Sequence, residues 1–411
     1  MTPASPPGGS PGAAEFAGPP SARDRSRWAE SDRFARPSRL AKLRARFDDA
    51  GVDAYFGVRP EHMRYLTGFT LASGEEKVAG TSGQFVVSRD QVVLFADSRY
   101  TVQARREAPD VQVQEAYGHL PSRWSALCGS LGVRRVAMDA QVMSQATWSA
   151  LQAAAPAVEL VPAEGWLEAD RALKDPSELE RVAAACAVAD RALAGLVPEI
   201  RAGMTEVDLA LRLEWLIRTG GAEALAFDVA CLSGPEAALP HGAPGDRPVV
   251  SGAVLLFDFG AQVAGYRSDM TRTLFVGDPT TRDLDLYEIV ARAQAATIAR
   301  LEAAVAGGGE LPSGRALDAV ARDVIADAGH AEHFGHGTGH GIGLATHEAP
   351  SLGQRAPEVP LPSPTVFSVE PGIYLDGETG VRIEDLILLD ADAGRVERLT
   401  RFPRDVLVIG G

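Results

Sequence analysis

Residues 366–374 read VFSVEPGIY and residues 380–389 read GVRIEDLILL, and each of these strand-like stretches carries one glutamate, Glu370 or Glu384. A carboxylate is seldom buried among apolar residues unless a positive group pairs with it. Three further ligand-type residues stand upstream in apolar or glycine-rich stretches: Asp258, Asp269 and His340. Two divalent metal ions would supply the missing positive charge, so the pattern predicts a dinuclear metal hydrolase.

Residues 253–276 (AVLLFDFGAQVAGYRSDMTRTLFV) have two strand-like ends and a glycine-containing connection. A hairpin or broad turn there would bring Asp258 and Asp269 together. Taken alone, the same residues also fit a structural role, in which Asp258 caps a turn and Asp269 pairs with Arg272. Both interpretations stay open at this point.

Residues 335–343 read GHGTGHGIG, with a glycine at every second position. Each glycine in a helix would cost roughly 1 kcal/mol, so we expect an extended or looping backbone. A period of two then places His336 and His340 on one face, and the glycines let another segment or a ligand approach the backbone. We interpret His330 and His333, just before this run, as surface residues.

The segment GVRIED (380–385) puts Arg382 and Glu384 on the same face of a strand, because side chains alternate along it. We therefore predict that Arg382 orients the Glu384 carboxylate, as partners of metal ligands often do. A plain ion pair on a sheet is the alternative. Glu370 likewise shares a face with Ser368. Oxygen ligands with one imidazole favour Mn, Co, Zn or Fe over copper, and the carboxylate excess favours Mn or Co.

The composition is that of an ordinary globular protein, with 411 residues, 45% of them hydrophobic and 23% charged, which favours two domains. The formal charge of -15 argues against nucleic-acid binding. No run approaches the ~20 apolar residues of a membrane span, and the first residues lack the apolar core of a secretory signal. We expect a cytoplasmic protein that contacts neither nucleic acid nor membranes. The three widely spaced cysteines predict free buried thiols.

Residues 1–36 are rich in Pro, Gly, Ala and Ser, and we expect a flexible tail there. Order is predicted to begin near Ser38 with a helix that stops at Gly51. Strand-like runs at 84–87, 92–96 and 133–138, with helices between them, predict an α/β domain over 37–165. Residues 166–175 are expected to form a linker.

A second domain is predicted over residues 176–411, because Asp175, Pro176 and Glu178 form a helix-start signature. Long helices are expected in this domain, interleaved with the strands that carry the acidic residues. Their predicted ranges are 176–197, 205–219, 284–306 and 314–328.

Four segments together resemble the pita-bread metallopeptidases, a family that includes Xaa-Pro dipeptidase (prolidase), aminopeptidase P, methionine aminopeptidase and the metal-free creatinase. They are FDFGAQVAGYRSDMTRT, GHGTGHGIGLATHEAP, VFSVEPGIY and GVRIED, in the family's order. The resemblance covers about residues 40–411 and implies an α/β two-domain protein. Its N-terminal α/β domain would be creatinase-like, since YLTGF (65–69) and LFADSRYTVQA (94–104) are similar to that domain. The C-terminal domain would have the pita-bread α+β fold. We also expect a homodimer.

By this resemblance all the ligand positions are filled, and the chain binds two divalent metal ions. Asp269 and Glu384 would bridge the metals, Asp258 would complete one site, and His340 with Glu370 would complete the other. Glu370 would also act as the catalytic base and acid, since proline's secondary amine must be protonated to depart.

Three further histidines match family positions near the substrate. His241, in LPHGAPGD, and His347 resemble histidines that hydrogen-bond the reacting carbonyl or the oxyanion. His336 resembles one that lines the proline pocket. These matches imply an exopeptidase that cleaves the Xaa-Pro bond of proline-containing di- or oligopeptides.

Dipeptides are the expected substrates, because the short interval between Glu370 and Glu384 resembles the compact prolidases. A dipeptidase needs a cation for the substrate's C-terminal carboxylate, and Arg355, in PSLGQRAPE, is the candidate. A surface arginine is equally compatible with that sequence. Aminopeptidase P activity on longer peptides is the alternative, and an inactive peptide-binding module of the same fold is a more distant one.

Overall fold

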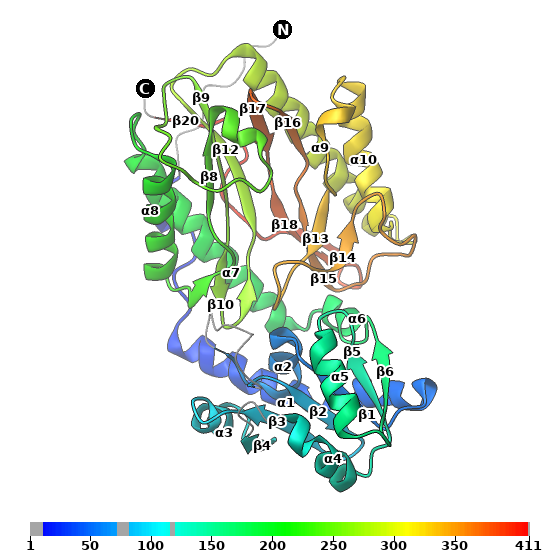
Figure 1. Ribbon diagram of the computed structural model, residues 1–411. Coiled ribbons are helices and arrows are strands. Elements are labelled where there is room, and N and C mark those ends of the chain that lie inside the picture. The colour runs from blue at the N-terminus through cyan, green and yellow to red at the C-terminus, as the bar shows by residue number, and fades with distance from the viewer. Residues whose placement is uncertain (1–10, 72–81, 116–119, 410–411) are drawn as a thin grey trace. The chain divides into compact units, whose positions relative to one another are not determined.

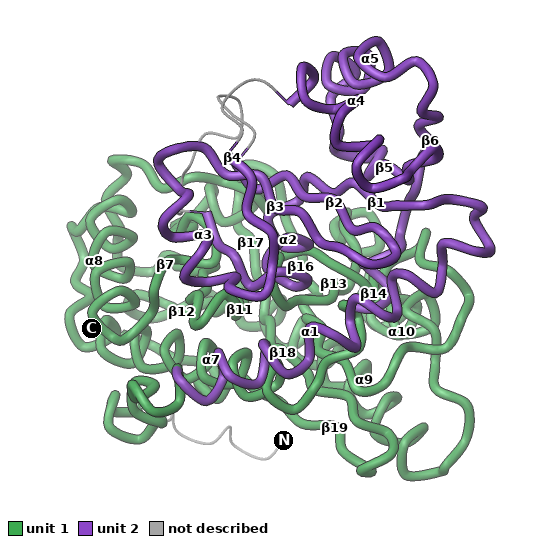
Figure 2. The backbone as a smooth tube through the Cα atoms, turned by 90° about the horizontal axis from the view of Figure 1, so that it is seen from below, with its two compact units in different colours: residues 1–25, 171–411 green, residues 26–170 purple. Residues whose placement is uncertain are grey.

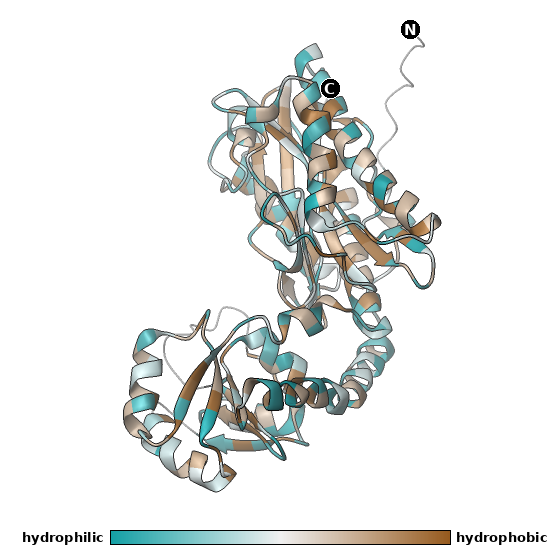
Figure 3. Ribbon diagram, turned by 90° about the vertical axis from the view of Figure 1, so that its right-hand side faces the viewer, coloured by the Kyte–Doolittle hydropathy of each residue, from teal (hydrophilic) through white to brown (hydrophobic). Residues whose placement is uncertain are grey.

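The computed structural model describes residues 11–71, 82–115 and 120–409, which divide into two compact units. Residues 26–170 form the N-terminal unit, and residues 11–25 join residues 171–409 in the C-terminal unit (Figure 2). Apolar residues concentrate in the strands of both units (Figure 3), as expected when sheets supply the core.

The N-terminal unit is built on one six-stranded sheet in the order β4–β3–β2–β1–β5–β6. The pairs β3–β4, β1–β5 and β5–β6 are parallel, whereas β1–β2 and β2–β3 are antiparallel. The strands are β1 (Ala54–Gly57), β2 (Phe85–Ser88), β3 (Val92–Ala96), β4 (Gln112–Glu115), β5 (Arg135–Asp139) and β6 (Glu159–Ala163). The helices are α1 (Ala22–Ala50), α2 (Pro60–Thr67), α3 (Thr101–Glu107), α4 (Leu120–Leu131) and α5 (Gln145–Ala154). The predicted strands correspond to β2, β3 and β5, within a residue or two at their ends.

One boundary prediction was wrong. Helix α1 begins at Ala22, well before Ser38, so the expected tail over 1–36 is helical in its last part. Its arginines stabilise it: Arg36 is buried and donates to the Thr67 carbonyl oxygen at 2.8 Å. A charged helix held by such contacts lacks the apolar stripe that reveals a helix in sequence. The division between the two units, at residues 170 and 171, lies within the expected linker over 166–175, and this stretch contains the short helix α6 (Glu168–Ala172).

The C-terminal unit contains a four-stranded sheet, β20–β12–β9–β8, and a five-stranded sheet, β14–β13–β15–β18–β19. A three-stranded sheet, β11–β10–β7, and the pair β16–β17 complete it. The strands of the larger sheets are β8 (Ala230–Ser233), β9 (Ala253–Phe259), β12 (Met270–Val276), β13 (Gly339–Gly341), β14 (Glu348–Leu352), β15 (Thr365–Val369), β18 (Asp385–Asp390), β19 (Arg395–Arg398) and β20 (Val408–Ile409). The remaining strands are β7 (Ala224–Leu225), β10 (Ala261–Val263), β11 (Tyr266–Arg267), β16 (Gly372–Leu375) and β17 (Thr379–Arg382).

Four long helices flank these strands, with α7 and α8 on one side and α9 and α10 on the other (Figure 1). They are α7 (Pro176–Leu196), α8 (Glu206–Thr219), α9 (Thr281–Ala306) and α10 (Gly314–Asp327), which confirms the four helices predicted from sequence. Helix α7 starts with the predicted capping box, because Asp175 accepts from the Glu178 amide and Glu178 accepts from the Asp175 amide. The helices therefore enclose the strands that carry the acidic residues.

Asp258 and Asp269 are brought together by the predicted hairpin. Strands β9 and β12 pair antiparallel, with Asp258 opposite Thr271, and Asp269 immediately precedes β12. The chain reverses at Ala264 and Gly265, which both have positive φ. Gly260 lets the two arms approach closely, because a β-carbon there would lie 1.9 Å from the Ser268 carbonyl oxygen. The prediction of a hairpin is confirmed.

The glycine run is also extended, as expected. Strand β13 lies between β14 and β15. A β-carbon at Gly339 would lie 1.9 Å from the Ser368 carbonyl oxygen, and one at Gly341 would lie 2.1 Å from the Ala349 carbonyl oxygen. Only glycine permits this approach, so β13 can hold His340 between two neighbouring strands.

Candidate active site

A cavity of about 380 Å³ in the C-terminal unit collects most of the candidate residues. It is lined by Phe227, Pro240, His241, Asp258, Asp269, His336, Gly337, Gly339, His340, Thr346, His347, Glu370, Arg382 and Glu384. The cavity is large enough for a dipeptide-sized ligand. Every site residue predicted from sequence lines it except Arg355.

Neighbouring strand ends place the acidic groups. Asp258 lies on β9, Glu370 directly follows β15, and Glu384 lies between β17 and β18. The backbone of Glu384 is fixed by its amide, which donates to the Thr271 carbonyl oxygen at 3.1 Å. The Glu370 amide donates to the Thr338 carbonyl oxygen at 2.8 Å. The backbone that carries these carboxylates is therefore held by hydrogen bonds to neighbouring segments.

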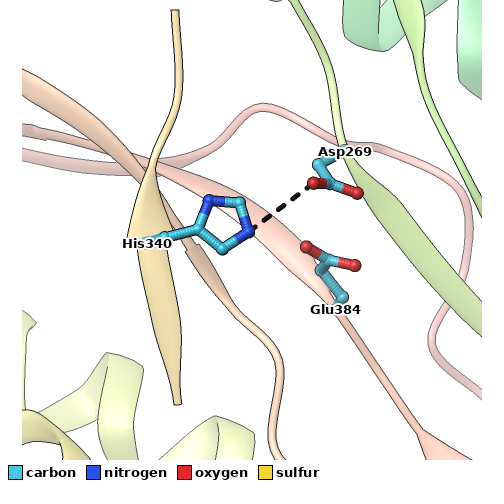
Figure 4. A group of neighbouring side chains, drawn as sticks. All are labelled: Asp269, His340 and Glu384. Atoms are coloured by element: carbon cyan, nitrogen blue, oxygen red, sulfur yellow. Dashed lines mark ion pairs between the residues drawn. The ribbon is translucent and has the colours of Figure 1, made fainter. Parts of the chain in front are cut away.

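Asp269, His340 and Glu384 form a group whose ligand atoms all lie within 4.8 Å of one another (Figure 4). The His340 Nε2 atom is 3.7 Å from Asp269 Oδ2. On the other side of the ring, Nδ1 is 3.1 Å from the Gly341 carbonyl oxygen. That contact orients the ring so that Nε2 faces the carboxylates, where it would be the lone-pair atom of a metal-ligating histidine. Burial opposes protonation of the ring, but the hydrogen bond and charge of Glu370 outweigh it and raise the pKa of His340 to about 9, so a bound cation would take the place of the Nε2 proton.

The donor set fits divalent cations. Among the described residues, Asp258 Oδ1 and Glu384 Oε1 are buried oxygens without a hydrogen-bond partner. Burial and the neighbouring carboxylates Glu384 and Asp258 raise the pKa of Asp269 well above its usual value. Burial and the charges of Glu370 and Asp258 likewise raise the pKa of Glu384. Like charges at this separation need cations between them to stay ionised together.

Glu370 is held next to His340. Burial opposes ionisation, but the hydrogen bond and charge of His340 outweigh it and lower the pKa of Glu370 to about 2. Its Oε1 atom accepts from the Ser368 hydroxyl at 2.8 Å and lies 3.3 Å from His340 Nε2. The prediction that Glu370 shares a face with Ser368 is confirmed.

Arg382 binds a different carboxylate from the one predicted. Its Nη2 atom donates to Asp258 Oδ2 at 2.6 Å, rather than to Glu384. The link to Glu384 runs through a third side chain: Arg382 Nε donates to the Thr271 hydroxyl at 2.9 Å, and that hydroxyl donates to Glu384 Oε2 at 2.7 Å. The prediction assumed that one strand carries both residues, with side chains alternating along it. Strand β17 ends at Arg382, so this alternation does not extend to Glu384.

Sequence reasoning missed Thr271 and Tyr374. Tyr374 accepts from Arg382 Nη1 at 2.9 Å and lies 2.8 Å from His336 Nε2. These contacts connect His336 to the arginine that holds Asp258. A tyrosine on the strand after VFSVEPG gives no polar signal in sequence, because buried tyrosines are common in sheets.

His347 and His241 lie at the cavity on less regular backbone. The His347 ring lies beside that of His340, with 4.1 Å between ring centroids and 44° between ring planes. Burial and the charge of His340 lower the pKa of His347, so its ring is neutral at pH 7. His241 follows a short 3₁₀ turn (Gly234–Ala238) and is exposed to solvent at the cavity wall. Both rings can donate hydrogen bonds to a bound carbonyl.

A buried ion cluster supports the segment that carries His347. Glu348 accepts from Lys174 Nζ at 2.8 Å and also from the Arg171 guanidinium, and all three side chains are almost fully buried. The cluster links the start of β14 to the residues just before α7. Removing one member leaves buried charge without its partner, which is more costly than losing an exposed pair.

Replacing Glu348 by glutamine should therefore lower the free energy of unfolding by about 3–5 kcal/mol. Burial acts to raise the pKa of Glu348, but Lys174 and Arg171 outweigh it and lower that pKa below the usual 4.5. A carboxyl whose pKa is lowered in the folded state stabilises it above the unfolded-state pKa, and this contribution disappears as pH falls. Denaturant unfolding of both proteins between pH 7 and pH 3 measures the difference, which should shrink toward acid.

The matched control is E159Q, because Glu159 forms an exposed pair with Arg135. Such a pair contributes about 0–1 kcal/mol. Equal losses in E348Q and E159Q would contradict the special role of the buried cluster.

Comparison with known proteins shows to which family the chain belongs. The model of metallopeptidase family M24 matches residues 180–391, and that of the creatinase/prolidase N-terminal domain matches residues 39–173. The chain belongs to metallopeptidase family M24. It is accordingly a metal-dependent peptidase of the prolidase type, with the pita-bread fold in its C-terminal unit.

Three relatives illustrate the similarity of this M24 peptidase to characterised proteins. It is 31% identical to an Xaa-Pro dipeptidase of Pyrococcus furiosus, over 90% of this chain and 99% of the relative. Among solved structures, an Xaa-Pro dipeptidase from Bacillus anthracis has a TM-score of 0.81 at 32% identity. An X-Pro aminopeptidase from Thermotoga maritima has a TM-score of 0.79 at 33% identity. Both structures align over 90% of this chain and 99% of their own. Among the described residues of this M24 peptidase, no helix is long and apolar enough to cross a membrane.

Proposed function

We propose that this chain is an Xaa-Pro dipeptidase that uses two divalent cations. The observation that carries the proposal is the convergence of one imidazole and four carboxylates on one cavity, with two buried carboxylate oxygens lacking any partner among the described residues. The proposed ligands are Asp258, Asp269, His340, Glu370 and Glu384. Relatives named as Xaa-Pro dipeptidases support the choice of substrate bond.

When bound, such cations polarise a substrate carbonyl and make water a nucleophile at neutral pH. The residues of the chain provide the remaining functions. Glu370 Oε2 has no hydrogen-bond partner among the described residues, whereas Oε1 accepts from Ser368. We assign proton transfer to Oε2, which would take the proton of the attacking water and return it to the proline nitrogen.

His241 and His347 would donate hydrogen bonds to the carbonyl oxygen as negative charge develops on it. His336 would contact the proline ring, with Tyr374 fixing its imidazole at 2.8 Å. Arg382 would keep Asp258 oriented toward the cavity through the bond at 2.6 Å. Of these side chains, Tyr374 and Arg382 lie on strands β16 and β17, whereas the three histidines lie on less regular backbone.

The test is a comparison of substrates on purified protein loaded with Mn or Co. We expect hydrolysis of Gly-Pro and Met-Pro, with slower cleavage of an Xaa-Pro-Xaa tripeptide. Faster cleavage of the tripeptide would assign aminopeptidase P activity to the chain. Failure to cleave any of these peptides, with metal bound, would contradict the proposal.

The prediction that Arg355 binds the substrate carboxylate is not supported by its position. Arg355 is exposed and does not line the cavity, and the preceding residue, Gln354, accepts from Arg315 of α10 at 2.8 Å. We therefore expect R355A to leave KM for Gly-Pro within about two-fold of wild type, as for surface substitutions generally. A selective rise of KM for dipeptides, with tripeptide cleavage unchanged, would restore the original assignment.

Three finer expectations from the sequence remain part of the proposal. Mn or Co is the expected metal because carboxylate ligands outnumber imidazole. The homodimer and the cytoplasmic location stay predictions. Elemental analysis of protein purified without added metal, together with its mass in solution, tests the first two.

A further inference from the structure

We infer that Glu206, which lies outside the cavity, positions the loop that carries His241. The inference rests on the proposed peptidase function, because it assigns a positioning role for one of the proposed catalytic histidines. Glu206 is the first residue of α8 and is 1% exposed. It is not among the residues that line the cavity.

The carboxylate of Glu206 binds both ends of the His241 loop, residues 234–244. Its Oε1 atom accepts from the Ser233 amide at 2.7 Å, directly before the loop. Its Oε2 atom accepts from the Gly245 amide at 3.1 Å, directly after the loop. One buried side chain therefore bridges the residues at the two ends of the loop that holds His241.

Backbone bonds from α8 reach only the second of these ends, since Ser233, at the first, belongs to β8 and is paired with Leu255 of β9. The Val207 amide donates to the Gly245 carbonyl oxygen and the Glu206 amide to the Arg247 carbonyl oxygen, both at 3.1 Å. The N-terminal amides of α8 are thereby satisfied by the chain that leaves the loop. The connection from this helix to Ser233, on the strand that enters the loop, is made by the Glu206 side chain.

His241 depends on its loop for its position. Its ring is exposed, and the structure gives it no hydrogen-bond partner among the described residues. The neighbouring contacts are to backbone: Arg382 Nη1 donates to the Pro240 carbonyl oxygen at 3.3 Å, and the Gly242 amide donates to the Leu239 carbonyl oxygen at 3.0 Å. A shift of either loop end would therefore move the imidazole relative to the substrate carbonyl.

The test is the isosteric variant E206Q. An amide has one acceptor oxygen, so its NH₂ group must face either the Ser233 or the Gly245 amide, donor against donor. A misplacement of about 1 Å in a catalytic group lowers the rate on the order of 10²-fold. We expect kcat for Gly-Pro to fall by about that factor, with metal content and KM unchanged.

The variant pair H241A and E206Q/H241A separates positioning from a general structural role. If Glu206 acts through His241, E206Q causes no further loss of kcat in the H241A background. The same fold-loss in both backgrounds, or a wild-type kcat in E206Q, would overturn the inference. The matched control is E199A: Glu199 also faces α8, through an exposed pair with Arg212, and its removal should leave kcat unchanged.

Hydrogen–deuterium exchange of the metal-loaded protein provides a readout that needs no substrate. Peptides from residues 233–247 should exchange faster in E206Q than in wild type, and peptides from the strands that carry the proposed ligands should not. Unchanged exchange in 233–247 would overturn the inference. If the wild-type protein cleaves no Xaa-Pro peptide, the proposed function fails, whereas the exchange data still decide whether Glu206 holds the loop.

Discussion

Replacing Asp269 by asparagine is expected to abolish metal binding and hydrolysis together. A carboxylate oxygen of Asp269 lies within 4.8 Å of the ligand atoms of both His340 and Glu384, and asparagine keeps the shape of the side chain while removing its charge. Metal ions supply several kcal/mol of transition-state stabilisation, so the loss of kcat/KM should be about 10³-fold or more. Elemental analysis and Gly-Pro hydrolysis measure the two effects, and a chelator should bring the wild-type protein to the same residual rate.

The stability of the metal-free proteins gives an independent check. Burial and the adjacent carboxylates raise the pKa of Asp269, which means that its ionised form destabilises the folded state at pH 7. Metal-free D269N should therefore unfold at a higher temperature than metal-free wild type. The control D323N, at an exposed position of α10, should match wild type in metal content and rate. Full metal content in D269N would remove Asp269 from the ligand set.

Replacing His347 by alanine should lower turnover about 10²–10³-fold, the usual cost of losing one donor to a developing oxyanion. The metal content should stay at the wild-type value, because His347 is not a proposed ligand. Its neutral ring lies beside His340, so the variant removes a donor at the cavity without removing a charge. Steady-state kinetics with Gly-Pro and elemental analysis of the same sample are the measurements.

The exposed His333 offers the matched control, and H333A should behave as wild type. H241A should resemble H347A, because both histidines are proposed to contact the same carbonyl. Loss of metal in H347A would move this residue from the substrate contacts to the ligands. An unchanged kcat in both variants would show that neither ring stabilises the reacting oxygen.

Much of the C-terminal unit could be predicted from sequence, because its strands and helices follow local rules. The capping box at Asp175 and the alternating glycines from residue 335 each determined an element correctly. The same holds for the hairpin over residues 253–276, in which Gly260 leaves room for the Ser268 carbonyl oxygen that a β-carbon would exclude. These signals are local, so they can be interpreted without knowing the tertiary structure.

What could not be predicted depends on partners far away in the chain. Arg382 pairs with Asp258, on a strand that no local period relates to it. Arg36 supports α1 through a carbonyl of α2, which a hydropathy pattern does not register. Arg355 was assigned by its charge alone, and the path of its loop carries it away from the cavity. In each case the residue type indicated a charged contact, but the sequence did not indicate which group the side chain contacts.

The division into two units has a consequence for how the protein is made. During synthesis domains fold as units, in general beginning from the N-terminal side. All residues of the N-terminal unit precede residue 171, whereas the proposed ligands appear in order from Asp258 to Glu384. A nascent chain therefore acquires its first folded unit long before any metal centre can assemble. A premature stop between Glu370 and Glu384 would release a partly folded protein that retains four of the five proposed ligands and cannot complete the site.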